Sequence, residues 1–137
     1  MIDLNGKMHR LVLTSHNDRS DRDKSQPHSN ALSLLLEIFP DTPVFEEITI
    51  PGNNHRMYLD IFLPKIPLAI EVHGQQHYKF TPFFHKSKAD FLISCRRDRD
   101  KQEWCRINLI PMAILPYDQE HTWQNLISLA ISPGSTI

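Results

Sequence analysis

The chain has 137 residues, of which 40% are hydrophobic and 23% are charged. This length suits one compact domain, and the composition excludes a wholly disordered chain and a fibrous protein. The net charge of −1 is not that of a strongly basic nucleic-acid-binding protein, so the local distribution of charge is more informative than its sum.

Targeting signals and cysteine chemistry add little to this outline. No apolar run approaches the length of a membrane span, and no signal-peptide pattern opens the chain, so we expect a cytosolic protein without membrane partners. Cys95 and Cys105 form neither a CxxC pair nor a disulfide framework. We expect them to be reduced thiols on one helix.

The N-terminal part is predicted to be largely irregular. A short strand is expected at 10–14, whereas residues 15–29 are polar, charged and without periodicity, which is typical of a loop or mobile arm. We therefore predict an N-terminal strand and arm, partly flexible, over residues 1–28. A single domain is expected over residues 29–137.

A helix and three strands are predicted next. Ser29 is a suitable N-cap for a helix with one apolar stripe, which Pro40 ends. Alternating or continuous apolar residues predict strands over 44–50, 56–64 and 68–74. Their short connections predict an antiparallel meander, and the third strand is nearly all apolar, so it should be central.

Two helices and a fourth strand complete the predicted fold. Ser87 and Asp90 form a capping box for a helix from about 88 to 106. Residues 108–117 read as a strand that arrives after this helix and should join the sheet in parallel. An apolar face over 121–131 predicts a closing amphipathic helix. The order α-β-β-β-α-β-α predicts an α/β fold with a mixed sheet flanked by helices.

Two carboxylates occupy apolar strands of this meander, where an unpaired charge is costly. Asp60 and Glu71 are about equally far from the turn between their strands, so an antiparallel pair would bring them together. A divalent cation such as Mg²⁺ would relieve their repulsion. His73 is two residues after Glu71 and shares its strand face. A metal on two carboxylates beside a basic group suits phosphodiester hydrolysis.

The stretch YLDIFLPKIPLAIEVHG, residues 58–74, resembles the core of the PD-(D/E)XK nuclease superfamily, which has the restriction-endonuclease-like fold. That core has an acid on one strand and an acid-x-lysine on the next. Asp60 and Glu71 match the two acids, but His73 stands in the lysine place. Imidazole titrates near neutrality, so His73 would act either as general base or as charge stabiliser.

A narrower resemblance extends over residues 29–117. A strand ending in E-x-H-G-x-x-H is followed by a helix with D-x-x-K-x-x-W-C, and then by N-x-I and a strand ending near tyrosine. The matching residues are Glu71, His73, Gly74, His77, Asp98, Lys101, Trp104, Cys105, Asn108, Ile110 and Tyr117. The pattern is similar to small phage and bacterial nucleases, including very-short-patch repair endonucleases and the EDxHD homing endonucleases.

This resemblance implies a homing- or repair-type endodeoxyribonuclease that depends on Mg²⁺ or Mn²⁺, acts on double-stranded DNA and works in the cytoplasm of a bacterial or phage-infected cell. Asp60, Glu71 and the Val72 carbonyl would hold the metal, while His77 and Glu37 would support the attacking water. We expect a homodimer or a nicking monomer. The residues expected to contact the phosphates are Lys79, Arg96, Arg97 and Lys101, with Asp98 in a supporting role.

Other interpretations remain open. The histidine in the lysine place and the near-neutral pI favour a catalytically inactive nucleic-acid-binding module or interaction subunit on the same fold. Asp98 and Lys101, three residues apart on one helix, would alternatively pair with each other. Glu37 would alternatively be a surface acid. A zinc site is conceivable, although its ligands match no standard spacing: His73, His77, His85 and Cys95.

Overall fold

The computed structural model describes residues 1–4, 6–8, 25–52, 56–74 and 87–132. The predicted order of elements is confirmed, with one short 3₁₀ helix before the last helix. The predicted strand at 10–14, His77 and Lys79 lie outside the described residues. The elements are α2 (Gln26–Ile38), β1 (Phe45–Pro51), β2 (Arg56–Leu63), β3 (Leu68–His73), α3 (Lys88–Ile107), β4 (Met112–Pro116), η3 (Glu120–Thr122) and α4 (Trp123–Ile131).

Helix α2 begins earlier than its sequence pattern suggested. The Oγ of Ser25 accepts a hydrogen bond of 3.2 Å from the His28 N–H group, which makes Ser25 the N-cap. Pro27 lies in the first turn, where its missing N–H group costs nothing. The expectation that Ser29 caps the helix was therefore wrong, because Ser29 lies inside it.

The sheet has the order β1-β2-β3-β4. The first three strands are antiparallel neighbours, and β4 pairs with β3 in parallel, as predicted. Strand β4 has five residues and is shorter than expected. Its start is delayed because Leu109 adopts a φ of 57° and the Ile110 N–H group bonds back to the Cys105 carbonyl. Residues 108–110 thus close α3, and pairing with β3 begins at Pro111, whose carbonyl accepts from the Ala69 N–H group.

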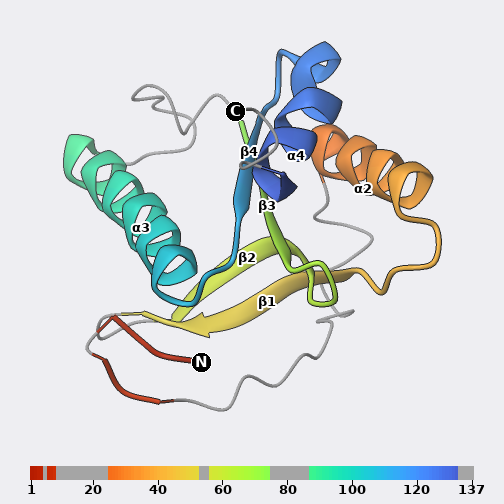
Figure 1. Cartoon of the computed structure of the whole chain (residues 1–137). Helices are drawn as coiled ribbons and strands as arrows, with labels where there is room; N and C mark the ends of the chain where they lie inside the picture. The colour runs from red at the N-terminus through yellow and green to blue at the C-terminus, as the bar shows by residue number, and fades with distance from the viewer. Residues whose placement is uncertain (5, 9–24, 53–55, 75–86, 133–137) are drawn as a thin grey trace.

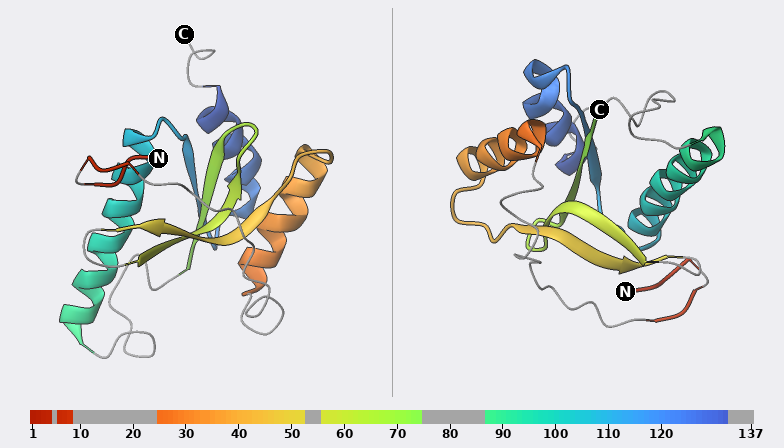
Figure 2. Two further views of the ribbon diagram at one scale, coloured as in Figure 1. Left: turned by 90° about the horizontal axis from the view of Figure 1, so that it is seen from below. Right: turned by 180° about the vertical axis from the view of Figure 1, so that it is seen from behind.

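Helices cover both faces of this sheet (Figures 1 and 2). Helices α2 and α4 pack on one face around Leu35, Ile70 and Ile127. Helix α3 lies on the other side, where Trp104 and Cys105 pack against apolar residues of β1, β2 and β3. Each large apolar side chain buried in these layers contributes about 1.5–3 kcal/mol to folding. None of the described helices is both long and apolar enough to cross a bilayer.

Strands β2 and β3 are paired only at the C-terminal end of β2. Their ladder pairs Leu63 with Leu68, Phe62 with Ala69, and Ile61 with Ile70, and it stops there. The next pair in this register would be Asp60 and Glu71. Beyond this point β2 continues toward Arg56 paired with β1, while β3 continues paired with β4. We call the point of separation, residues 60 and 71–72, the strand fork.

Candidate metal centre

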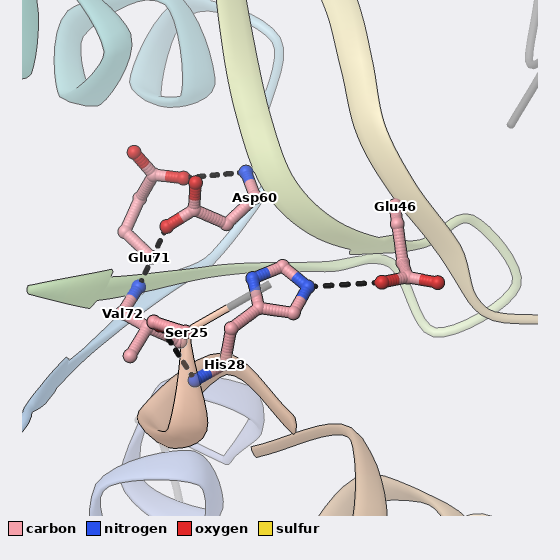
Figure 3. Close-up of polar contacts among 6 residues, drawn as sticks. All are labelled: Ser25, His28, Glu46, Asp60, Glu71 and Val72. Atoms are coloured by element: carbon pink, nitrogen blue, oxygen red, sulfur yellow. Dashed lines mark hydrogen bonds and ion pairs between the residues drawn. The ribbon is translucent and has the colours of Figure 1, made fainter. Parts of the chain in front are cut away.

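The two strand carboxylates occupy the strand fork and replace the missing ladder hydrogen bonds. Glu71 Oε2 accepts a hydrogen bond of 2.7 Å from the Asp60 N–H group, and Asp60 Oδ2 accepts one of 2.9 Å from the Val72 N–H group (Figure 3). Each side chain therefore satisfies a backbone donor on the opposite strand. The structure brings Asp60 and Glu71 together, as the turn spacing predicted.

Glu71 is held in an environment that disfavours its charge. Its side chain is 3% exposed. Burial, and next the negative charge of Asp60, raise its pKa from 4.5 to about 7, although the nearby ammonium of Lys101 acts in the opposite direction. A carboxylate of this kind gains more from a bound cation than one in water, because little solvent competes for it.

Lys101 reaches Glu71 from helix α3. Its Nζ donates a hydrogen bond of 2.8 Å to Glu71 Oε1. Burial alone would lower the pKa of Lys101, but the charges of Glu71 and Asp60 outweigh it and raise that pKa, so the side chain stays an ammonium. The geometry does not favour the alternative in which Lys101 pairs with Asp98, because the Lys101 ammonium donates its hydrogen bond to Glu71.

A second cluster shares Glu71 with the fork. One ligand atom each from Glu71, His73 and Asp98 lies within 4.8 Å of the others. Glu71 and His73 come from alternate positions of β3 and share the face toward α3, and Asp98 lies one helical turn before Lys101. Two carboxylates and an imidazole are a donor set that fits a divalent transition metal such as Mn²⁺ better than Mg²⁺, which prefers oxygen.

The other expected ligands are placed differently. Asp60 is outside the cluster of Glu71, His73 and Asp98, and its Oδ2 is engaged by the Val72 N–H group. The Val72 carbonyl points to the same side of β3 as its N–H group, because both groups of a strand residue face one neighbour. It therefore faces the strand fork.

Two residues assigned to the site by sequence are not brought to it. Glu37 lies exposed on α2, the helix that covers the opposite face of the sheet from α3. Arg96 is exposed on α3 but does not line the groove described next. His77 and Lys79 lie outside the described residues. Cys105 packs in the core, where burial raises its pKa to about 12, so it does not act as a thiolate.

A groove of about 480 Å³ adjoins the cluster of Glu71, His73 and Asp98, between β2 and α3. Arg97, Asp98 and Lys101 of its lining were expected at the site, but Arg56 and Tyr58 were not. Strand alternation from Asp60 could not have found Tyr58, because Leu59 and Ile61 belong to different core clusters and the period of two is therefore interrupted at Asp60. The lining residues are Arg56, Met57, Tyr58, Ser94, Arg97, Asp98 and Lys101.

A separate polar contact joins α2 to β1. His28 Nε2 lies 2.9 Å from Glu46 Oε1, and both side chains are largely buried (Figure 3). His28 belongs to the turn that Ser25 caps. Sequence reasoning missed this pair, because residues 15–29 were assigned to an arm. The contact fixes the start of α2 against the edge strand.

The chain is similar to two viral proteins of uncharacterised function. It is 39% identical over 66 residues to "Uncharacterized protein 307L" of Invertebrate iridescent virus 6, which covers 48% of this chain and 34% of that protein. It is 37% identical over 75 residues to "Uncharacterized protein 033L" of Invertebrate iridescent virus 3, which covers 55% of this chain and 38% of that protein. The matched region is thus little more than a third of either relative.

No family model matches the chain, and no solved structure matches it.

Proposed function

We propose that the chain is a metal-dependent endodeoxyribonuclease with the restriction-endonuclease-like fold of the PD-(D/E)XK superfamily. The observation that carries the proposal is the strand fork, where the buried carboxylate of Glu71 meets Asp60 and also belongs to a three-residue cluster with His73 and Asp98. The element order and the mixed sheet support the same fold. The sequence resemblance points to the same residues.

The roles of the residues follow from their geometry. Glu71, His73 and Asp98 would hold Mn²⁺ or Mg²⁺, with Asp60 and the Val72 carbonyl next to them at the fork. A bound divalent cation would polarise a phosphoryl oxygen and make a water molecule more acidic. Lys101 keeps its positive charge beside Glu71 and is placed to stabilise negative charge that develops on the phosphate.

This arrangement revises the role of His73. Histidine stands in the lysine place on β3, but Lys101 of α3 supplies an ammonium group beside Glu71 instead. His73 is then better suited as a metal ligand than as the charge stabiliser. Double-stranded DNA as the substrate and a homodimer or nicking monomer remain part of the proposal.

The test is cleavage of supercoiled plasmid with Mn²⁺ or Mg²⁺ by wild type, Glu71→Gln and Glu103→Gln, purified identically. Glu103 is the matched control, since it is a half-exposed acid on α3 that pairs with Arg106. We expect nicked or linear product from wild type and Glu103→Gln, and loss of at least about 100-fold in Glu71→Gln. Equal cleavage by all three proteins would contradict the proposal.

A second candidate is a catalytically inactive nucleic-acid-binding module on the same fold. The ion pair between Lys101 and Glu71 favours it, because it neutralises the buried carboxylate without a metal. Calorimetric titration with Mn²⁺ separates the two candidates. A nuclease binds the ion through Glu71, His73 and Asp98 and loses that binding in Asp98→Asn, whereas an inactive module binds none.

A further inference from the structure

The groove next to the cluster of Glu71, His73 and Asp98 has one wall from β2 and one from α3. Arg56 and Tyr58 come from the part of β2 beyond the strand fork, and Ser94 and Arg97 come from α3. Asp98 and Lys101 belong both to the groove lining and to the surroundings of Glu71. Whatever occupies the groove is therefore adjacent to the candidate metal centre.

The charge of the groove is opposite to that of the chain. Its lining contains three cations, Arg56, Arg97 and Lys101, against one carboxylate, Asp98, while the whole chain carries −1. Within the part of the chain that the structure describes, the guanidinium groups of Arg56 and Arg97 form no ion pair. Two guanidinium groups on facing walls suit the phosphates of one nucleic-acid strand.

The groove also presents an aromatic ring. Tyr58 is 40% exposed although it lies within a strand, whereas its neighbours Met57 and Leu59 pack in the core that includes Trp104 of α3. Exposed aromatic rings in a basic groove are stacking surfaces for unpaired bases. A volume of about 480 Å³ lies within the range of small-molecule pockets and suits one nucleotide.

We propose that this groove holds one unpaired nucleotide of the substrate strand, with its base against the Tyr58 ring and its flanking phosphates on Arg56 and Arg97. The inference rests on the proposed nuclease function and narrows its double-stranded DNA substrate to duplexes that contain an unpaired segment. DNA with a single-stranded segment, such as a gapped duplex, is the preferred ligand. The phosphate beside the unpaired nucleotide then lies next to Lys101 and the candidate metal ligands Glu71, His73 and Asp98.

The test is fluorescence anisotropy in EDTA, so that binding is measured without a metal and without cleavage. The probes are a labelled oligothymidine, a blunt duplex and a duplex with a single-stranded gap. Tyr58→Phe keeps the ring, whereas Tyr58→Ala removes it, and Tyr58→Thr removes it with a residue that favours strands. Arg97→Ala is compared with Arg96→Ala, its exposed neighbour on α3 outside the groove. Thermal unfolding verifies that each variant folds.

We expect wild type to bind gapped DNA and oligothymidine at least about 10-fold more tightly than the blunt duplex. Tyr58→Ala and Tyr58→Thr should lose roughly 10-fold for the unpaired probes and nothing for the duplex, whereas Tyr58→Phe stays near wild type. Arg97→Ala should weaken binding more than Arg96→Ala does.

Equal affinity of wild type for all three probes, no binding of any probe, or unchanged affinity after loss of the ring would overturn the inference. These failures differ from failure of the nuclease proposal. Probe preference and ring dependence without any Glu71-dependent cleavage would refute the nuclease alone. Glu71-dependent cleavage without ring dependence would refute the groove assignment alone.

Discussion

Glu71 has a structural role as well as the chemical role proposed for it. Its two carboxylate oxygens accept hydrogen bonds from different elements, the Asp60 backbone on β2 and the Lys101 ammonium on α3. One side chain thus ties β3 to the neighbouring strand β2 and to helix α3. The cost is a buried negative charge beside another carboxylate, which is why its pKa is raised.

This raised pKa predicts how stability depends on pH. Between the ordinary value of 4.5 and about 7, the unfolded chain has released the Glu71 proton that the folded chain keeps. Rising pH in this window therefore favours the unfolded state, and the effect levels off above it. From about pH 5 to about pH 8, wild type should lose about 2–3 kcal/mol of unfolding free energy relative to Glu71→Gln.

Urea denaturation of both proteins at several pH values measures this difference. The comparison with Glu71→Gln removes contributions from other titrating groups. A constant difference between the two proteins across this window would show that Glu71 titrates as it does in the unfolded chain.

Asp60 gives a second prediction at the scale of one residue. Asp60→Asn keeps an oxygen that can accept the Val72 N–H group and removes the charge that opposes ionisation of Glu71. Asp60→Ala removes the acceptor and leaves a donor unsatisfied at the fork. Asp60→Ala should therefore be about 1–3 kcal/mol less stable than Asp60→Asn in chemical denaturation. Equal stability would mean that water satisfies the Val72 N–H group.

At the scale of elements, the start of α2 depends on one hydroxyl group. The Ser25 side chain accepts from the His28 N–H group, and the His28 side chain contacts Glu46 on β1. The cap therefore orients the residue that joins the helix to the sheet. Ser29, by contrast, lies within the helix.

This difference is testable with a matched pair of substitutions. Ser25→Ala should cost about 1 kcal/mol of unfolding free energy because it removes the cap. Ser29→Ala should be neutral or slightly stabilising, because alanine has the higher helix propensity. Thermal and chemical unfolding of the two variants measures the contrast, and the reverse order of stabilities would place the cap at Ser29.

Particular elements show what a sequence can predict in this fold. The strand positions of Asp60 and Glu71 follow from apolar periodicity and from the short turn between them, so their proximity was predictable. The role of Ser25 was not, because the polar composition of residues 15–29 is that of an arm and the helix gains its start from tertiary contact with Glu46. Local pattern alone does not contain that contact.

The site as a whole depends on how α3 lies across the sheet. Asp98 and Lys101 were recognised as functional candidates, but their distances from Glu71 are set by the packing of Trp104 and Cys105 against the strands. The same packing places Arg97 across the groove from Arg56 and Tyr58. These juxtapositions join residues 27 to 41 positions apart in the sequence, which no periodicity encodes.

The whole molecule should respond to a bound cation. A metal that binds only the folded cluster of Glu71, His73 and Asp98 stabilises the fold by mass action, by about 2.7 kcal/mol at a concentration 100-fold above its Kd. Mn²⁺ should therefore raise the melting temperature of wild type and of Glu103→Gln, and EDTA should reverse the rise.

Two variants identify the ligands in the same experiment. Asp98→Asn should lose most of the thermal shift, whereas Asp60→Asn should keep part of it, because Asp60 is outside the three-residue cluster. A shift that survives in Asp98→Asn and disappears in Asp60→Asn would instead assign the ion to Asp60 and Glu71 at the strand fork.

The two side-chain hydrogen bonds at the strand fork also report locally on whether a cation is bound. The Asp60 N–H group is held by Glu71, which belongs to the three-residue cluster, and the Val72 N–H group is held by Asp60, which lies outside that cluster. If either carboxylate turns away, its amide proton loses protection while the neighbouring ladder stays intact. An ion on the three-residue cluster would then raise deuterium uptake at the Asp60 amide alone, even while the molecule as a whole becomes harder to unfold, whereas a rise at Val72 as well would include Asp60 among the ligands.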